Sequence, residues 1–108
     1  MVKDGILKKR YIRDKLIFEG EYLNGKINGK CKEYYINGEL KFEGEYLNGK
    51  RWNGKGFKGF NNIIYVLKNG NGNIKEYDDY GKLLFKSEYL NGEINGRGKN
   101  IIMIMMVH

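Results

Sequence analysis

Apolar and charged residues alternate along much of this chain, and one eight-residue stretch shows the alternation best. Phe18-Glu-Gly-Glu-Tyr-Leu-Asn-Gly25 places an aromatic residue or glycine at every second position with carboxylates between them, which predicts a half-buried strand. The stretch recurs unchanged at Phe42–Gly49, with two substitutions at Phe85–Gly92, and in divergent form at Ile63–Gly70. The starts at 18, 42, 63 and 85 indicate an array of supersecondary repeats.

Asn-Gly pairs recur along the array. Both residues tolerate positive φ, so this pair is the strongest short-range signal for a two-residue hairpin turn. We interpret them as hairpin turns and expect the first returning strand over Lys30–Ile36. Little helix is expected, because glycine and asparagine are poor helix formers. The fold class predicted is all-β, an elongated antiparallel sheet of consecutive β-hairpin repeats with essentially no helix. The nine pairs begin at Asn24, Asn28, Asn37, Asn48, Asn53, Asn69, Asn71, Asn91 and Asn95.

Three regions follow from this pattern. Residues 1–14 have no clean period and are expected to form either a basic arm or a strand that caps the first repeat. Residues 15–99 form the repeat array. Residues 100–108 are an apolar tail where a further Lys-Glu-Tyr-Tyr segment is expected, and they resemble an AT-rich coding string read one base out of frame. We hypothesise that a frameshift produced this tail, which sequencing of the locus tests.

The repeats predict their own packing. Phe18, Gly20 and Tyr22 fall on one face of a strand, and the glycine leaves a slot in which an aromatic ring of a neighbouring unit can lie. Glutamates and lysines fall on the opposite, wet face, where cross-strand pairs contribute about 0.2–1 kcal/mol each. The expected structural repeat positions are Phe18, Gly20, Tyr22, Gly25, Phe42, Gly44, Tyr46, Gly49, Phe85, Tyr89 and Gly92.

The composition limits the chemistry of the chain. Cys31 is the single cysteine and His108 the single histidine, which argues against a closed zinc site and a histidine-dependent triad. The carboxylate pair Glu19/Glu21 recurs as Glu43/Glu45, as a solvated sheet face does and a catalytic pair does not. Glycine-rich segments such as Asn69–Asn73 are explained by turns, because no helix is expected to follow them. We therefore predict no enzyme activity, no cofactor and no metal.

The net charge of +7 is unevenly distributed. Segment 1–17 carries +4, whereas segments 18–41, 42–62, 63–84 and 85–108 carry 0, +2, 0 and +1. Nucleic-acid binding is disfavoured, because the repeats are nearly neutral and their aromatic residues face the expected core. The basic residues Lys8, Lys9, Arg10 and Arg13 could instead contact anionic lipid.

The units at Phe18–Cys31, Phe42–Gly56 and Phe85–Gly98 resemble MORN repeats, in which an aromatic-x-Gly-x-aromatic strand is followed by Gly and Gly-x-Gly. Residues 32–40 are also similar to a bacterial MORN-variant family that includes antitoxin components. The resemblance implies a non-catalytic array and gives weight to lipid association. Cys31, Ile74 and Ser87 depart from the glycines of the pattern, as does the whole of Ile63–Gly70.

These observations predict a non-catalytic scaffold that mediates protein–protein interaction, with self-association through the open sheet ends as one form of it. Peripheral binding of anionic membrane lipid through the basic arm and the repeat face is the alternative. An antitoxin-like partner role is a second alternative, suggested by the resemblance alone. Trp52 either contacts a partner or folds back onto the apolar seam. With no apolar signal segment among residues 1–16, we expect a cytoplasmic protein, with a location peripheral to a membrane as the alternative.

Overall fold

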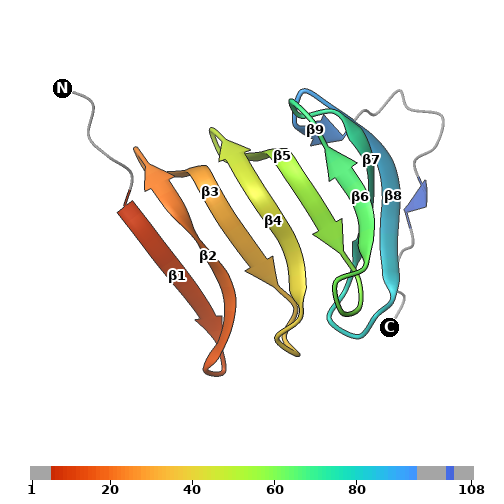
Figure 1. Ribbon diagram of the computed structural model, residues 1–108, viewed down its shortest axis with the longest axis horizontal. Helices are drawn as coiled ribbons and strands as arrows, with labels where there is room; N and C mark the ends of the chain where they lie inside the picture. The colour runs from red at the N-terminus through yellow and green to blue at the C-terminus, as the bar shows by residue number, and fades with distance from the viewer. Residues whose placement is uncertain (1–5, 95–101, 104–108) are drawn as a thin grey trace.

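The computed structural model describes residues 6–94 and the backbone of residues 102–103, and every regular element in this part is a strand. The predicted all-β array of consecutive antiparallel hairpins is confirmed (Figure 1). The strands are β1 (Ile6–Ile12), β2 (Lys15–Leu23), β3 (Lys26–Tyr34), β4 (Leu40–Leu47), β5 (Lys50–Phe57), β6 (Ile63–Leu67), β7 (Gly72–Tyr77), β8 (Leu83–Leu90), β9 (Glu93–Ile94) and β10 (Ile102–Met103).

Two sheets contain these strands. Strands β1 to β6 form one sheet in chain order, and β7 and β8 form a second sheet in which β9 and β10 also pair with β8. Residues 6–12 of the N-terminal segment form strand β1, which pairs with β2. The frameshift hypothesis concerns the 100–108 tail, which lies outside the described residues apart from the backbone of β10.

The Asn-Gly pairs fall into two structural classes. The pairs that begin at Asn24, Asn48, Asn69 and Asn91 are two-residue turns, with asparagine φ between 49° and 53° and glycine φ between 78° and 84°. This is the type I′ geometry that the sequence predicted. The pair at Asn37 lies in a five-residue loop, closed by a hydrogen bond from Tyr35 N to Glu39 O.

The remaining described Asn-Gly pairs are not turns, so the prediction was wrong for them. Asn28-Gly29 and Asn53-Gly54 lie inside β3 and β5, and Asn71-Gly72 lies at the start of β7. The first returning strand accordingly begins at Lys26 rather than Lys30. The pairing register of β2 and β3 shifts between Gly20 and Tyr22. Asn28 and Gly29 lie in the bulge that this shift creates on β3.

The asparagines of these three pairs link each unit to the next. The Oδ1 atom of Asn28 accepts a hydrogen bond of 3.0 Å from Asn48 N, in the following Asn-Gly turn. Next to it, Gly49 N donates to Ile27 O over 2.8 Å. The arrangement repeats in the next units: Asn69 N donates to Asn53 Oδ1 over 2.8 Å, and Asn91 N donates to Asn71 Oδ1 over 3.1 Å. We call this series the asparagine ladder.

Aromatic rings form the predicted seam along one face of the array. Phe18 and Phe42 are 7% and 0% exposed, and each packs edge-on against Tyr46, with ring centroids 6.5 and 6.2 Å apart. Tyr22 packs edge-on against Phe18, and Tyr65 stacks on Phe42. Aromatic pairs in these arrangements contribute about 0.5–1.5 kcal/mol beyond their buried area. The seam therefore joins β2, β4 and β6 through side chains as well as through the backbone.

Glycines make room for the seam, but not all in the expected way. A Cβ atom at Gly56 would lie 1.9 Å from Cε2 of Tyr65, so this ring lies directly on the backbone of the neighbouring strand. At Gly44, where a ring was expected, a Cβ would instead lie 2.0 Å from the carbonyl oxygen of Asn53. There the glycine allows two backbones to approach, and the ring of Phe42 lies against Gly54 of the partner strand.

Replacement of Gly56 by alanine tests the contact between ring and glycine. The added methyl group must displace the ring of Tyr65, and overpacking of this kind costs about 1–3 kcal/mol. Urea unfolding followed by circular dichroism should show this loss of stability. Lys55→Ala, at the exposed neighbouring residue, is the control and should change stability by about 0.5 kcal/mol or less. Equal effects of the two substitutions would contradict the close packing.

Candidate interaction surface

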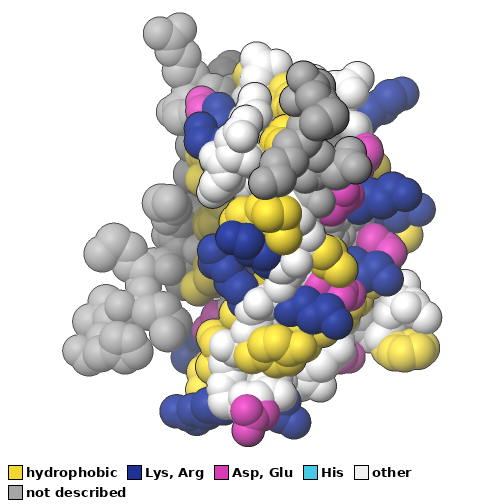
Figure 2. All heavy atoms as spheres, turned by 90° about the vertical axis from the view of Figure 1, so that its left-hand side faces the viewer, with side chains coloured by type: hydrophobic (Ala, Val, Ile, Leu, Met, Phe, Trp, Pro, Cys, Tyr) yellow, Lys and Arg dark blue, Asp and Glu magenta, His cyan; other side chains and the backbone are white. Residues whose placement is uncertain are grey.

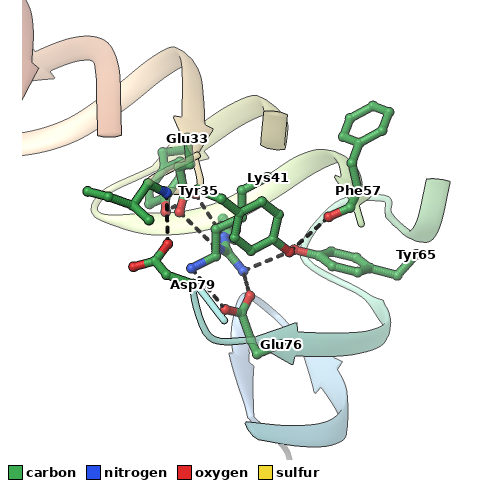
Figure 3. Close-up of polar contacts among 10 residues, drawn as sticks. Glu33, Tyr35, Lys41, Phe57, Tyr65, Glu76 and Asp79 are labelled. Atoms are coloured by element: carbon green, nitrogen blue, oxygen red, sulfur yellow. Dashed lines mark hydrogen bonds and ion pairs between the residues drawn. The ribbon is translucent and has the colours of Figure 1, made fainter. Parts of the chain in front are cut away.

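A cluster of charged side chains lies beside the aromatic seam, and Figure 3 shows Glu33, Lys41 and Glu76 of this cluster near Tyr65. Arg51 of β5 donates from Nε and Nη2 to the two carboxylate oxygens of Glu33 on β3, over 2.9 and 2.8 Å. Its Nη1 atom contacts the carboxylate of Glu76 on β7 and donates to the Tyr65 hydroxyl over 3.0 Å. Lys41 lies 3.6 Å from Glu76. The cluster thus connects the two sheets through side chains.

Local sequence explains why this arginine is at this place. In the first and last hairpins the residue opposite the repeat tyrosine is Ile27 and Ile94, whereas in the second it is Arg51. The rings of the seam shield the cluster, since the side chains of Arg51, Glu33 and Glu76 are 11%, 15% and 13% exposed. The guanidinium group also lies 5.0 Å from the centroid of the Phe42 ring.

The electrostatics of the cluster keep its charges in place. Burial alone would raise the pKa of the Glu33 carboxyl, but the hydrogen bonds and positive charge of Arg51 outweigh it and hold that pKa below its usual value. Burial also opposes the charge of Arg51, yet its carboxylate partners raise the arginine pKa well above the ordinary range. Because each charge has a partner, the cluster has no free acid, base or nucleophile and acts as a structural connection.

Replacement of Arg51 by methionine should destabilise the fold strongly. It deprives two shielded carboxylates of their arginine partner, and breaking a buried pair in this way costs about 3–5 kcal/mol. The triple variant Arg51→Met/Glu33→Gln/Glu76→Gln removes all three charges and should recover much of the loss. Urea denaturation of both proteins measures the difference. A triple variant no more stable than Arg51→Met would show that the unpaired carboxylate charges do not cause the loss of stability.

Acidification provides a second test of the cluster. Because the pKa of Glu33 is lower in the folded than in the unfolded chain, its contribution is fully present above the usual pKa of 4.5 and is lost as the pH falls through the folded-state value. The stability difference between the wild type and Glu33→Gln should therefore be constant near neutral pH and shrink below about pH 4.5. Exposed Glu43, whose ion pair with Lys32 is worth about 0–1 kcal/mol, provides the control variant Glu43→Gln.

Strand β1 is the most exposed long element of the described chain. All seven of its residues are exposed, and Ile6, Leu7 and Tyr11 are 55%, 63% and 58% accessible. Basic side chains lie among them: Lys8 and Arg10 lie over the Tyr22 ring, and the guanidinium of Arg10 donates to the Tyr22 hydroxyl over 2.8 Å. Figure 2 looks onto this end of the molecule, where apolar and basic side chains are intermixed. The predicted interaction residues Lys8, Lys9, Arg10 and Arg13 are all exposed here.

The charged face of the repeats has a different character. Lys9, Glu19, Lys32, Glu43 and Lys55 lie opposite one another on five successive strands and alternate in sign. Lys32 and Glu43 are 3.6 Å apart. Since neighbouring charges compensate, this face offers little net attraction to a polyanion or an anionic membrane. The basic character is concentrated on β1.

The other predicted residues have structural positions. Trp52 is half-buried, and its indole lies beneath the turn glycines Gly70 and Gly92, where Cβ atoms would lie 2.7 and 3.3 Å from its ring. Phe85 and Tyr89 pack against the core. Gly25 and Gly49 occupy positive-φ turn positions. Burial raises the pKa of the Cys31 thiol to about 12, so this cysteine has little thiolate character near neutral pH.

Sequence reasoning missed two features of this surface. The Arg51 cluster was not predicted, although the replacement of Ile27 and Ile94 by an arginine in otherwise matching repeats is a detectable signal. The linking role of Asn28, Asn53 and Asn71 was hidden because Asn-Gly pairs that form turns and those that do not are identical in the amino-acid sequence. No helix in the described part of the chain is long and apolar enough to cross a membrane.

The repeat geometry agrees with the comparison to known families. The profile of the MORN repeat matches residues 18–39, 42–58 and 85–99, which together make up half of the chain. The chain is a MORN repeat protein. MORN repeats are commonly modules for interaction with proteins or membranes and are generally non-catalytic. The profile does not match the divergent third unit, Ile63–Gly70. Comparison with curated proteins and with solved structures finds no match.

Proposed function

We propose that this MORN repeat protein is a non-catalytic scaffold that binds a partner protein through strand β1. The observation that carries the proposal is the contrast between the centre of the array and its first strand. The Arg51 cluster joins β3, β5 and β7 through shielded side chains, whereas β1 presents exposed apolar and basic side chains along an edge. Exposed apolar side chains beside an open strand edge are typical of an interaction site.

The pairing of polar side chains within the array supports a binding role over catalysis. Its polar groups are paired within the repeats, as in the bonds from Tyr46 and Arg51 to Glu33 and from Tyr34 to Glu19. In the described residues, no buried side-chain nitrogen or oxygen lacks a partner. An antitoxin-like role would be one form of this scaffold function, with a toxin as the partner. The cytoplasmic location stays a prediction from the sequence.

A comparison of matched variants tests the proposal. Ile6→Asp/Leu7→Asp changes two side chains that are more than half exposed and should leave folding intact. The control Phe60→Asp/Val66→Asp changes two apolar side chains that are also more than half exposed, on β6 and in the loop before it, at the edge of the sheet opposite β1. Wild type and control should retain the same proteins from native lysate in near-stoichiometric amounts, and the β1 variant should lose them. Retention of the same proteins by the β1 variant would refute the assignment to β1.

Binding to an anionic membrane is the second candidate function. It is favoured by the position of Lys8, Lys9, Arg10 and Arg13 on or beside the exposed strand with Ile6 and Leu7. Each basic residue near such a surface contributes about 1 kcal/mol. Co-sedimentation with phosphatidylserine vesicles, compared with phosphatidylcholine vesicles at low and high salt, distinguishes this function from the first.

A further inference from the structure

We propose that the open edge of β1 binds an extended acidic strand of a partner protein, in the same register in which β3 binds β2. The partner segment would carry the pattern aromatic-Glu-small-Glu-aromatic. This inference rests on the proposed function and specifies the chemistry of the partner. It follows from a structural equivalence between β1 and β3, from the charges at the edge, and from what those charges exclude.

The equivalence is visible in the pairing register. Strand β1 lies against β2 as β3 lies against β4. The register shifts at the equivalent place in both pairings, directly after Arg10 in β1 and directly after Glu33 in β3. β1 thus occupies the place of a returning strand. The matched pairs are Arg10 with Phe18, Lys9 with Glu19 and Lys8 with Gly20 in one hairpin, and Glu33 with Phe42, Lys32 with Glu43 and Cys31 with Gly44 in the other.

Strand β3 shows what such a strand binds on its second edge. It has β2 on one side and β4 on the other, and both neighbours present the same residues to it. Lys32 lies opposite Glu19 and Glu43, and Cys31 lies opposite Gly20 and Gly44. In the described part of the chain β1 has only the first of these two neighbours. Its outer edge therefore presents unpaired backbone groups in a register that the fold already uses twice.

The charges at this edge select an acidic strand. The row of alternating charges across five strands ends on the outside at Lys9, which has a glutamate neighbour on the inner side only. An incoming glutamate opposite Lys9 would extend the row by one step. Cross-strand pairs of opposite charge are favourable, and like charges directly opposite one another are unfavourable. An aromatic side chain next to it in the strand would lie opposite Arg10, as Phe18 does on the inner side.

The same charges disfavour a second copy of the protein as the occupant. Two β1 edges paired antiparallel would bring Lys8, Lys9 and Arg10 of one copy close to the same residues of the other. Strand β7, the end strand of the second sheet, also carries a lysine, Lys75, directly before Glu76. Lysines on an open edge are a known device against edge-to-edge association. The edge of β1 therefore disfavours pairing with the β1 edge of a second copy and is complementary to an acidic strand.

A peptide-binding experiment tests the inference on the full chain. The probe is a fluorescent, capped peptide with the sequence Phe-Glu-Gly-Glu-Tyr-Leu-Asn-Gly, and fluorescence anisotropy measures its affinity. Lys9→Glu should weaken binding about 3- to 10-fold and should favour the charge-reversed peptide Phe-Lys-Gly-Lys-Tyr-Leu-Asn-Gly. Lys55→Glu is the matched control, because it creates the same clash with a neighbouring glutamate at the other end of the row. It should leave peptide binding unchanged.

Backbone methylation separates strand pairing from simple charge attraction. In a paired strand only every second amide points to the neighbour, so N-methylation of one set of alternate amides should abolish binding and methylation of the other set should not. Equal effects of both sets would overturn the proposed strand addition. Absence of peptide binding, with β1-dependent capture of a protein retained, would overturn the inference and leave the proposed function standing. Binding to phosphatidylserine vesicles without peptide binding would overturn the inference in favour of a membrane surface.

Discussion

The structure depends on aromatic rings that lie on the glycines of neighbouring strands. Tyr65 covers Gly56 and Phe42 lies against Gly54, so ring and backbone meet without an intervening side chain. Because each ring also touches the ring of the next unit, side-chain packing reaches across several strands. A single two-stranded hairpin is marginally stable at best in water. The contacts between units provide the burial that one hairpin lacks, which is the general basis of stability in repeat proteins.

The Arg51 cluster adds specificity to this apolar packing. A hydrophobic residue could occupy the position, as Ile27 and Ile94 do in the other hairpins. Replacement of a buried ion pair by apolar residues is often neutral or stabilising, so the cluster is weak support for stability by itself. Its bidentate geometry, however, fixes β3, β5 and β7 relative to one another. We infer that it determines where the second sheet lies against the first, a role that an isoleucine would perform less selectively.

The sequence was sufficient for the fold class and for the seam. Period-two alternation and exact repetition identify strands and their order, because they report directly on burial. The turns at Asn24, Asn48, Asn69 and Asn91 were also predictable, since their geometry needs positive φ. The asparagine ladder was not, because its hydrogen bonds join residues 16 to 20 positions apart, and only the pairing register brings them together. The partners of Arg51 were hidden for the same reason, since Glu33 and Glu76 lie 18 and 25 residues from it.

The asparagine ladder has a consequence for how such proteins grow. Each linked unit carries an acceptor for the unit that follows and a donor for the unit that precedes it, as Asn71 and Asn69 do within one hairpin. A duplicated gene segment that encodes one such unit would therefore also encode the hydrogen-bonding groups that join it to the units on both sides. Arrays of this kind could lengthen or shorten by whole units during evolution without any compensating mutation elsewhere. The size of the protein would then be set by recombination, and its chemistry by the few positions at which the copies differ.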